Sequence, residues 1–132
     1  MAFGNLKFDT LTTSDAKNTN TEKSLDTSYV FNGSAKQWVL LQSSGNSVTD
    51  SFNNSSVADN GTGDYTLTRT NNMANATYCA IGSSGDPQTS HNASSDVDVQ
   101  TTSVHDIRCV NDAATATQDV PDTVSTVHGD VA

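Results

Sequence analysis

A short turn sequence, Asn60-Gly61-Thr62-Gly63, separates two runs in which apolar and polar residues alternate. The alternation is clearest in the second run, where Tyr65 and Leu67 are each followed by a threonine. A period of two is typical of a β-strand with one face turned inward and the other outward. The two glycines provide the positive φ angles that a tight hairpin or a bulged turn requires. The sequence therefore predicts two antiparallel strands on either side of this turn, followed by a third strand after a polar loop at 70–75.

The amino-acid composition favours strands over helices throughout the chain. Nearly half of the 132 residues are Ser, Thr, Asn or Asp, and Glu22 is the only glutamate. Ser, Asn and Asp compete with the helical backbone for hydrogen bonds, whereas Thr and Val suit a half-buried pleated surface. Only 33% of the residues are hydrophobic, and a chain of this length builds one core rather than two. The chain is therefore predicted to be all-β, with its polar excess on outward faces and in loops.

The segment that follows residue 34 contains a regular series of short strand-like runs. The densest apolar run, Gln37 to Leu41, contains the only tryptophan and is predicted to be a central strand buried on both faces. Exposed loops are expected at 82–92 and 111–122. Seven or eight such strands predict an antiparallel β-sandwich over residues 35–132, of immunoglobulin-like or jelly-roll type. The sequence leaves both topologies open. The remaining strands are expected at 48–52, 77–81, 97–100, 104–110 and 124–131.

The apolar residues placed at alternate positions around the glycine turn are expected to share one hydrophobic cluster. Two cysteines, Cys79 and Cys109, also lie on predicted strands, and two interpretations of them are open. They are either joined in a disulfide or, as is commoner in a reducing cytoplasm, they serve as small buried apolar side chains. The expected members of the cluster are Trp38, Leu40, Phe52, Val57, Tyr65, Leu67, Tyr78 and Ile81.

Residues 1–34 differ from the rest of the chain and are predicted to form an extended N-terminal arm. They are polar, show little periodicity, and carry their apolar residues in two groups separated by a polar stretch. This pattern suits an arm that docks on its own domain or on a neighbouring subunit, and a flexible terminus is the alternative. The candidate partner-docking residues are Phe3, Leu6, Phe8, Leu11, Leu25, Tyr29 and Phe31.

The chain is acidic, with a formal net charge of −9. Four of its six basic residues lie before residue 37, and no basic stripe follows, so nucleic-acid binding is not expected. The acidity suits solubility, or else electrostatic docking on a basic partner. The start of the chain lacks the basic and apolar regions of a signal peptide, and no window has the apolar length of a membrane span.

The residues that could carry chemistry form no recognisable catalytic pattern. His91, His105 and His128 lie in separate segments, and the many serines do not form a Gly-x-Ser-x-Gly motif. Asp96 and Asp98 share one face of a predicted strand, and such pairs bind Ca²⁺ when carbonyl oxygens join them. Alternating aspartates are also typical of a solvated strand face. We therefore predict no enzymatic activity, no cofactor and no resident metal.

One part of the sequence resembles a family of structural proteins of marine tailed bacteriophages, often labelled tail-fibre proteins. The resemblance is carried by Ser51-Phe52-Asn53, by Asn60-Gly61-Thr62-Gly63-Asp64-Tyr65-Thr66 and by Met73-Ala74-Asn75-Ala76-Thr77-Tyr78. It extends less specifically to residues 24–38 and 127–131, which together bring it to roughly half of the chain. A fibre needs a shaft, however, and the chain has neither coiled-coil heptads nor a long β-helical repeat.

The resemblance implies a non-enzymatic component on the exterior of a tailed-phage virion. The lack of a shaft favours a compact knob that decorates the capsid or forms a short tail appendage. Its expected partners are other virion proteins and further copies of itself, with a trimer favoured, and a host-surface glycan as a further partner. The alternative is a receptor-binding or carbohydrate-binding adhesion module, for which Trp38, Tyr65 and Tyr78 would have to be exposed as sugar platforms.

Overall fold

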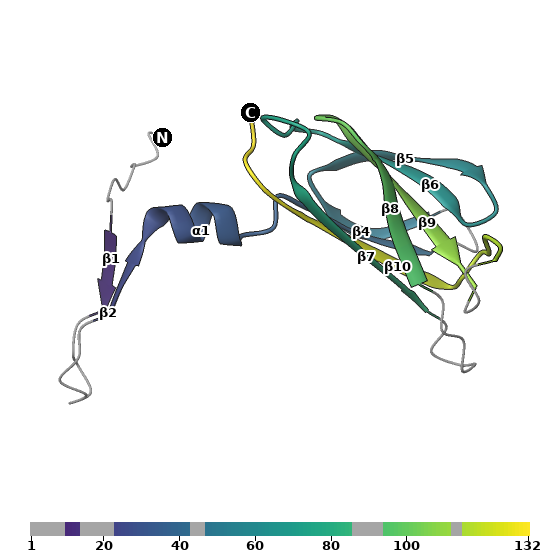
Figure 1. Cartoon of the computed structure of the whole chain (residues 1–132), viewed down its shortest axis with the longest axis horizontal. Coiled ribbons are helices and arrows are strands. Elements are labelled where there is room, and N and C mark those ends of the chain that lie inside the picture. The colour runs from purple at the N-terminus through teal and green to yellow at the C-terminus, as the bar shows by residue number, and fades with distance from the viewer. Residues whose placement is uncertain (1–9, 14–22, 43–46, 86–93, 112–114) are drawn as a thin grey trace. The chain divides into compact units, whose positions relative to one another are not determined.

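The computed structural model describes residues 10–13, 23–42, 47–85, 94–111 and 115–132 (Figure 1). It consists of two compact units, residues 1–34 and residues 35–132. Phe3, Leu6, Phe8 and His91 lie outside the described residues. Each unit is described by itself below.

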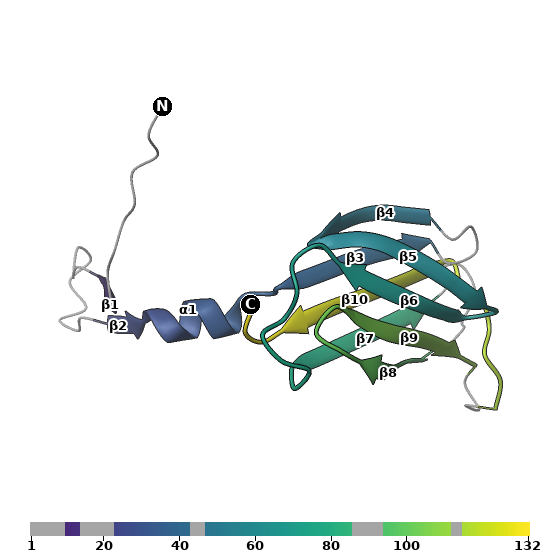
Figure 2. The same cartoon turned by 90° about the horizontal axis from the view of Figure 1, so that it is seen from above.

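The second unit is a β-sandwich, as the sequence predicts. Two four-stranded antiparallel sheets, ordered β4-β3-β10-β7 and β5-β6-β9-β8, stack face to face (Figure 2). The eight strands are β3 (Gln37–Gln42), β4 (Ser47–Phe52), β5 (Asn54–Gly61), β6 (Asp64–Arg69), β7 (Cys79–Gly85), β8 (Ser94–Gln100), β9 (Val104–Val110) and β10 (Asp122–His128).

The chain crosses from one sheet to the other four times, so that neighbours within a sheet are often distant in sequence. β3 and β10, the first and last strands of the sandwich, pair along their length, and β7 lies beside β8 where the two sheets meet. The ladders between β10 and its neighbours and between β6 and β9 are regular. The ladders of β4, β5 and β8 each contain a register shift of the kind that a β-bulge produces. The irregular ladders are thus those that involve these three edge strands.

The core lies between the sheets and is built by strict alternation along the strands. In β6 and β9 every second residue is buried, which places Tyr65, Leu67 and Ile107 at 1% exposure or less. A second, smaller cluster forms at one end around Met73. The main cluster consists of Val39, Leu41, Tyr65, Leu67, Ile107, Cys109 and Val120, with Val57 packed against it, and the second consists of Met73, Tyr78 and Val127.

The expected core is therefore correct for some residues and wrong for others. Trp38, Phe52 and Ile81 are exposed, and Leu40 is only half-buried. Of the other four expected members, Tyr65 and Leu67 lie in the main cluster with Val57 against it, while Tyr78 belongs to the second cluster. The run from Trp38 to Leu41 has apolar residues at both its even and its odd positions. The sequence therefore does not reveal whether Trp38 and Leu40 or Val39 and Leu41 face inward. In the structure Val39 and Leu41 face inward. The strand β3 is therefore buried on one face only, and the prediction that it is buried on both faces is wrong.

The glycine turn forms as predicted, with a φ of 134° at Gly61 and of 66° at Gly63. The Gly63 N–H donates to the Asp119 carboxylate over 2.7 Å, and the Tyr65 hydroxyl donates to the same oxygen. Val120, in the same loop, is 2% exposed. The expectation that residues 111–122 form a solvent-facing loop is thus wrong for this part, which packs against the sandwich. The expected turn from residue 82 is also wrong as far as Gly85, because β7 continues through it.

Gly63→Ala is expected to destabilise the sandwich by about 2–3 kcal/mol. An added Cβ would lie 2.5 Å from the Gln118 carbonyl oxygen and 2.8 Å from that of Cys109, and backbone atoms cannot move aside easily. Gly61→Ala is the matched control, since Gly61 also has a positive φ but has open space around it. Urea denaturation measures both, and an equal or smaller loss for Gly63→Ala would contradict this packing.

The first unit contains regular structure where an extended arm is expected. β1 (Thr10–Thr13) pairs with β2 (Lys23–Asp26), and the helix α1 follows at Thr27–Gly33. Asp26 caps the helix by accepting a hydrogen bond from the Ser28 N–H at 2.7 Å, which lowers the pKa of Asp26. An aspartate followed by hydroxyl residues is a helix-start signal, so the prediction of an extended segment is wrong for Thr27–Gly33.

Candidate docking surface

The outer face of the sheet β4-β3-β10-β7 is apolar, although it faces away from the core. In the register of the sheet, Trp38 lies between Phe52 on one side and Thr126 on the other, and Ile81 comes next on β7. A second row contains Leu40, which lies between Asp50 and Val124. Directly opposed residues of antiparallel strands project from the same side of a sheet. These rows therefore form one surface, which we call the apolar face and define as Trp38, Leu40, Phe52, Ile81 and Val124.

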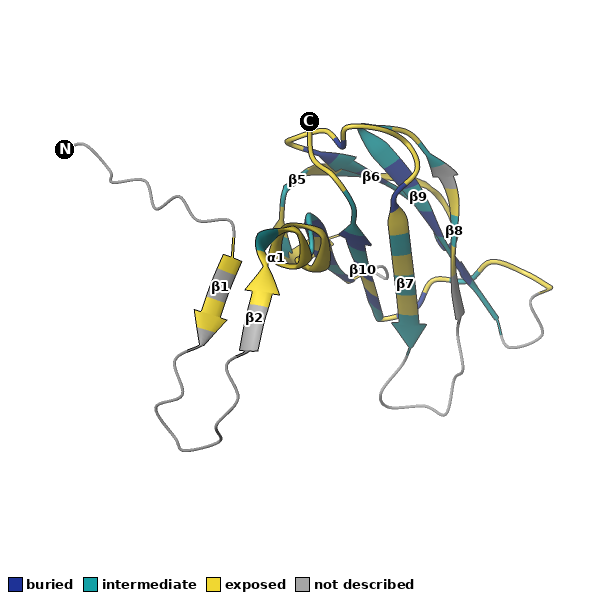
Figure 3. Cartoon of the chain, turned by 60° about the vertical axis from the view of Figure 1, so that its left-hand side comes forward, coloured by how far each residue is buried: buried dark blue, intermediate teal, exposed yellow. Residues whose placement is uncertain are grey.

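The large side chains of the apolar face are accessible. Trp38 is 38% exposed, Val124 43%, Phe52 53% and Ile81 55%. Figure 3 shows that exposed and half-buried positions alternate along most of β7. Single exposed apolar residues are common on proteins, but a contiguous group on one sheet marks a surface that another molecule covers.

The other sheet has the polar exterior that a solvated sheet normally has. On its outer face the Thr66 hydroxyl donates to Asp106 over 2.6 Å, and Asn60 donates to Thr66 over 2.9 Å. Arg108 pairs with Asp98 at 2.9 Å and lies 3.9 Å from Asp64. An antiparallel sandwich in water alternates apolar residues inward with polar residues outward. The exception made by β4-β3-β10-β7 is thus specific to one sheet and does not reflect a general excess of apolar residues.

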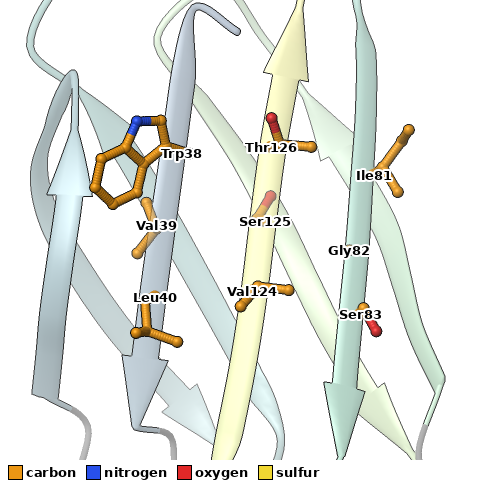
Figure 4. Close-up of a pocket in the computed structure, with 9 residues that line it drawn as sticks. All are labelled: Trp38, Val39, Leu40, Ile81, Gly82, Ser83, Val124, Ser125 and Thr126. Atoms are coloured by element: carbon orange, nitrogen blue, oxygen red, sulfur yellow. The ribbon is translucent and has the colours of Figure 1, made fainter.

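A shallow groove of about 290 Å³ runs across the apolar face (Figure 4). Its sides are Trp38 and Leu40 on β3 and Ile81 on β7, and Val124 and Thr126 of β10 lie between them. The side chains of β10 and the Gly82-Ser83 segment are smaller than the indole, which leaves the centre of the face hollow. A groove of this shape can accept a protruding apolar side chain or a short helix.

The sequence-predicted docking residues that the structure describes lie in the first unit. Leu11 and Leu25 are register partners in the β1–β2 pair, and Leu25 is 42% exposed. Tyr29 and Phe31 project from α1 at 69% and 68% exposure, together with the exposed Val30. No residue of α1 is buried. The structure thus leaves Leu25, Tyr29 and Phe31 accessible for docking, and it adds the apolar face as a second accessible surface.

Four of the five residues of the apolar face, all except Val124, are residues that the sequence analysis placed in the core. The sequence does contain a sign of this exposed face, because β3 and β10 each carry apolar residues at both even and odd positions. Val124 and Val127 on β10, for example, point to opposite faces of the sheet. Such a pattern is typical of a strand that is buried on both sides. In a two-layer sandwich the opposite sheet buries only one side of each strand, so the other side stays exposed unless another molecule binds there.

The other candidate residues are not brought together. His105 points into the core with 0% exposure, whereas Asp106 faces outward, and Asp98 pairs with Arg108. Within the described ranges no three His, Cys, Asp or Glu side chains form a group that could hold a metal ion. Cys79 is exposed and Cys109 is buried, and the two are not bonded to each other.

A buried polar cluster holds the two sheets together near Arg69. The Arg69 guanidinium donates to His105 Nδ1 over 3.0 Å and lies 4.4 Å from the centre of the Tyr78 ring. Because arginine can only donate, Nδ1 must accept, so the neutral ring carries its proton on Nε2 and donates to the Ser125 hydroxyl at 2.9 Å. Burial and the nearby Arg69 charge lower the pKa of His105 to about 4. With Ser125 only 5% exposed, this cluster has the character of a structural network.

Comparisons of the chain with protein-family models, with curated proteins and with solved structures gave no significant match. Across the described residues, no helix combines the length and the apolar character needed to cross a lipid bilayer. The functional argument therefore rests on the two accessible apolar surfaces and on the sequence resemblance.

Proposed function

We propose that this protein is a non-enzymatic structural component on the exterior of a tailed-phage virion, a compact knob that decorates the capsid or forms a short tail appendage. The observation that carries the proposal is the apolar face, since a protein that assembles needs a surface that its own fold leaves uncovered. The resemblance of residues 51–78 to phage structural proteins supports the same role, and so do the exposed apolar residues Tyr29 and Phe31 of the first unit.

Assembly also suits the energetics of this chain. With 33% hydrophobic residues and two small clusters, the sandwich buries little apolar surface for its length. Covering Trp38, Phe52 and Ile81 would add the kind of burial that stabilises a domain by roughly 25 cal/mol per Å². Binding to neighbours therefore stabilises each copy as well as the particle.

Localisation on the particle tests the proposal most directly. Immunogold electron microscopy and peptide mass spectrometry of gradient-purified virions should detect the protein in a fixed ratio to the major capsid protein. A free protein that never co-sediments with virions would refute the proposal, and hydrolysis of host glycans by the purified protein would favour a depolymerase.

A carbohydrate-binding adhesion module is the second candidate, and the exposed pair Trp38 and Phe52 favours it. These two rings are register partners on one sheet face, where a sugar could stack. Tyr65 and Tyr78, the other expected platforms, are buried at 1% and 8% exposure and cannot serve. The groove beside Trp38 also weakens this candidate, because Leu40, Ile81 and Val124 offer no side-chain hydrogen bonds to a sugar and only the small hydroxyls of Ser83 and Thr126 do.

Glycan-array binding distinguishes the two candidates. We expect no glycan signal from the wild-type protein, and a signal abolished by Trp38→Ala would favour the adhesion module. Gln42→Ala, an exposed change on the same strand, is the matched control for nonspecific effects.

A further inference from the structure

The helix α1 cannot owe its stability to itself. It has seven residues, none of them buried, and isolated helices of fewer than about 12–15 residues are marginal in water. Its central residues Tyr29, Val30 and Phe31 are large and exposed, and none of them is a strong helix former. A helix of this kind is expected to form fully when its apolar side chains pack against a surface.

The charges of the two units indicate which segment is the better occupant of the apolar face. Residues 35–132 contain eleven acidic and three basic residues, a formal net charge of −8, whereas residues 1–34 contain four acidic and three basic ones. Pairing two apolar faces with each other would oppose two strongly acidic domains and bring the exposed Asp50 of both copies together. The nearly neutral N-terminal segment meets far less repulsion, so charge favours it as the occupant.

The link between α1 and the sandwich favours a second copy over the same chain. The helix ends at Gly33, and the Lys36 N–H already bonds the Val127 carbonyl over 2.7 Å. Only Ser34 and Ala35 remain to turn the chain, and Ser34 is extended. Short connections of this kind favour the exchange of a segment between subunits.

We infer that α1 of one copy packs on the apolar face of a second copy, with Phe31 and the adjacent Val30, which lie on the same side of the helix as Thr27, set against the groove between Trp38 and Ile81. This inference deepens the proposed function, on which it rests, by naming the partner as the protein itself. The contact is heterologous, since helix meets sheet, and heterologous contacts close into rings when the rotation allows. One aromatic anchor buries on the order of 150–250 Å², which is small for a stable dimer. A ring such as a trimer gives each copy two such contacts.

Trp38 makes the inference directly measurable, because it is the only tryptophan in the chain. As the protein is concentrated, native mass spectrometry or sedimentation should show a discrete oligomer, and the Trp38 emission should shift to the blue in the same concentration range. The full-length double variant Val30→Ser/Phe31→Ser should remain monomeric with red-shifted emission throughout. The control Asn32→Ala, an exposed change on the same helix, should assemble like the wild type.

Mixing two variants, one altered in the helix and one altered in the apolar face, is the decisive test of this contact. The arm variant Val30→Ser/Phe31→Ser keeps an intact face, and the face variant Phe52→Ser/Ile81→Ser keeps an intact helix. Neither should assemble alone, but an equimolar mixture should form a heterodimer and shift the Trp38 emission of the arm variant. Circular dichroism of each variant verifies that it is folded.

Three results would overturn the inference. An oligomer that persists in the arm variant would show that face pairs with face. A monomer whose Trp38 emission is blue at all concentrations, and red in the arm variant, would show that α1 covers its own sheet. A monomer with red emission at all concentrations would show that the face has another partner. Each of these can occur in a protein that is present on virions, so failure here is distinct from failure of the proposed function.

Discussion

Leu67→Ala should lower the free energy of unfolding by about 2–5 kcal/mol, whereas Ile81→Ala should change it by less than about 0.5 kcal/mol in the monomer. Leu67 is 1% exposed in the main cluster, so its truncation leaves a cavity, and Ile81 is 55% exposed on the apolar face. From the alternation in the sequence, both residues are expected to lie in the core. The structure buries Leu67 and leaves Ile81 on the surface.

Urea denaturation at a concentration where the protein is monomeric measures both changes. Val39→Ala and Trp38→Ala form a second matched pair on adjacent positions of β3, one facing the core and the other facing out. A large loss for Ile81→Ala with a small one for Leu67→Ala would mean that the sheet faces are inverted. At assembling concentrations Ile81→Ala should instead weaken the oligomer.

Acid should destabilise the fold through His105. Its pKa is lowered from 6.5 to about 4 in the folded protein by burial and by the Arg69 charge. Between these two values the unfolded chain binds a proton that the folded chain does not, so stability falls as the pH falls from about 6.5 to about 4. At roughly 1.4 kcal/mol per pKa unit the full loss is about 3 kcal/mol. Below that window His105 contributes no further slope.

The variant His105→Gln isolates this contribution. Glutamine can still accept a hydrogen bond from Arg69, but it does not titrate, while His91, His128 and the carboxylates are unchanged. The difference in unfolding free energy between the wild type and the variant, measured from neutral pH to about pH 4, should therefore shrink as the pH falls. A difference that stays constant over this range would show that His105 is protonated with little cost in the folded state.

The fold class could be predicted from the sequence because several independent signals agree. The glycine turn, the alternation in β6 and β9 and the scarcity of helix-forming residues all favour an antiparallel sandwich. The face of β3 could not be predicted, since Trp38 to Leu41 is apolar at both parities and a shift of one residue exchanges core and surface. The packing of Val39 and Leu41 against the other sheet resolves this ambiguity, and it depends on contacts between residues that are distant in sequence.

Two further features depend on contacts that local sequence does not report. The segment around Val120 is polar and is predicted to be an exposed loop, yet Asp119 accepts hydrogen bonds from the Gly63 N–H and the Tyr65 hydroxyl and so holds it against the sandwich. His105 is buried, which the sequence analysis did not predict, and the hydrogen bond that it accepts from Arg69 joins residues 36 positions apart. The candidate docking residues Tyr29 and Phe31 were found from composition alone, and their helical setting comes from the Asp26 cap.

The register shifts of β4, β5 and β8 bear on how densely such a protein can be crowded. A straight edge strand offers a row of free amides and carbonyls on which another chain can polymerise into fibrils, and bulges twist that row out of line. Here each of these three edges is interrupted in this way, and the regular edge β7 lies beside β8. Many copies can therefore be held at a high local concentration, and the contacts between them are made by side chains and not by the pairing of edge-strand backbones.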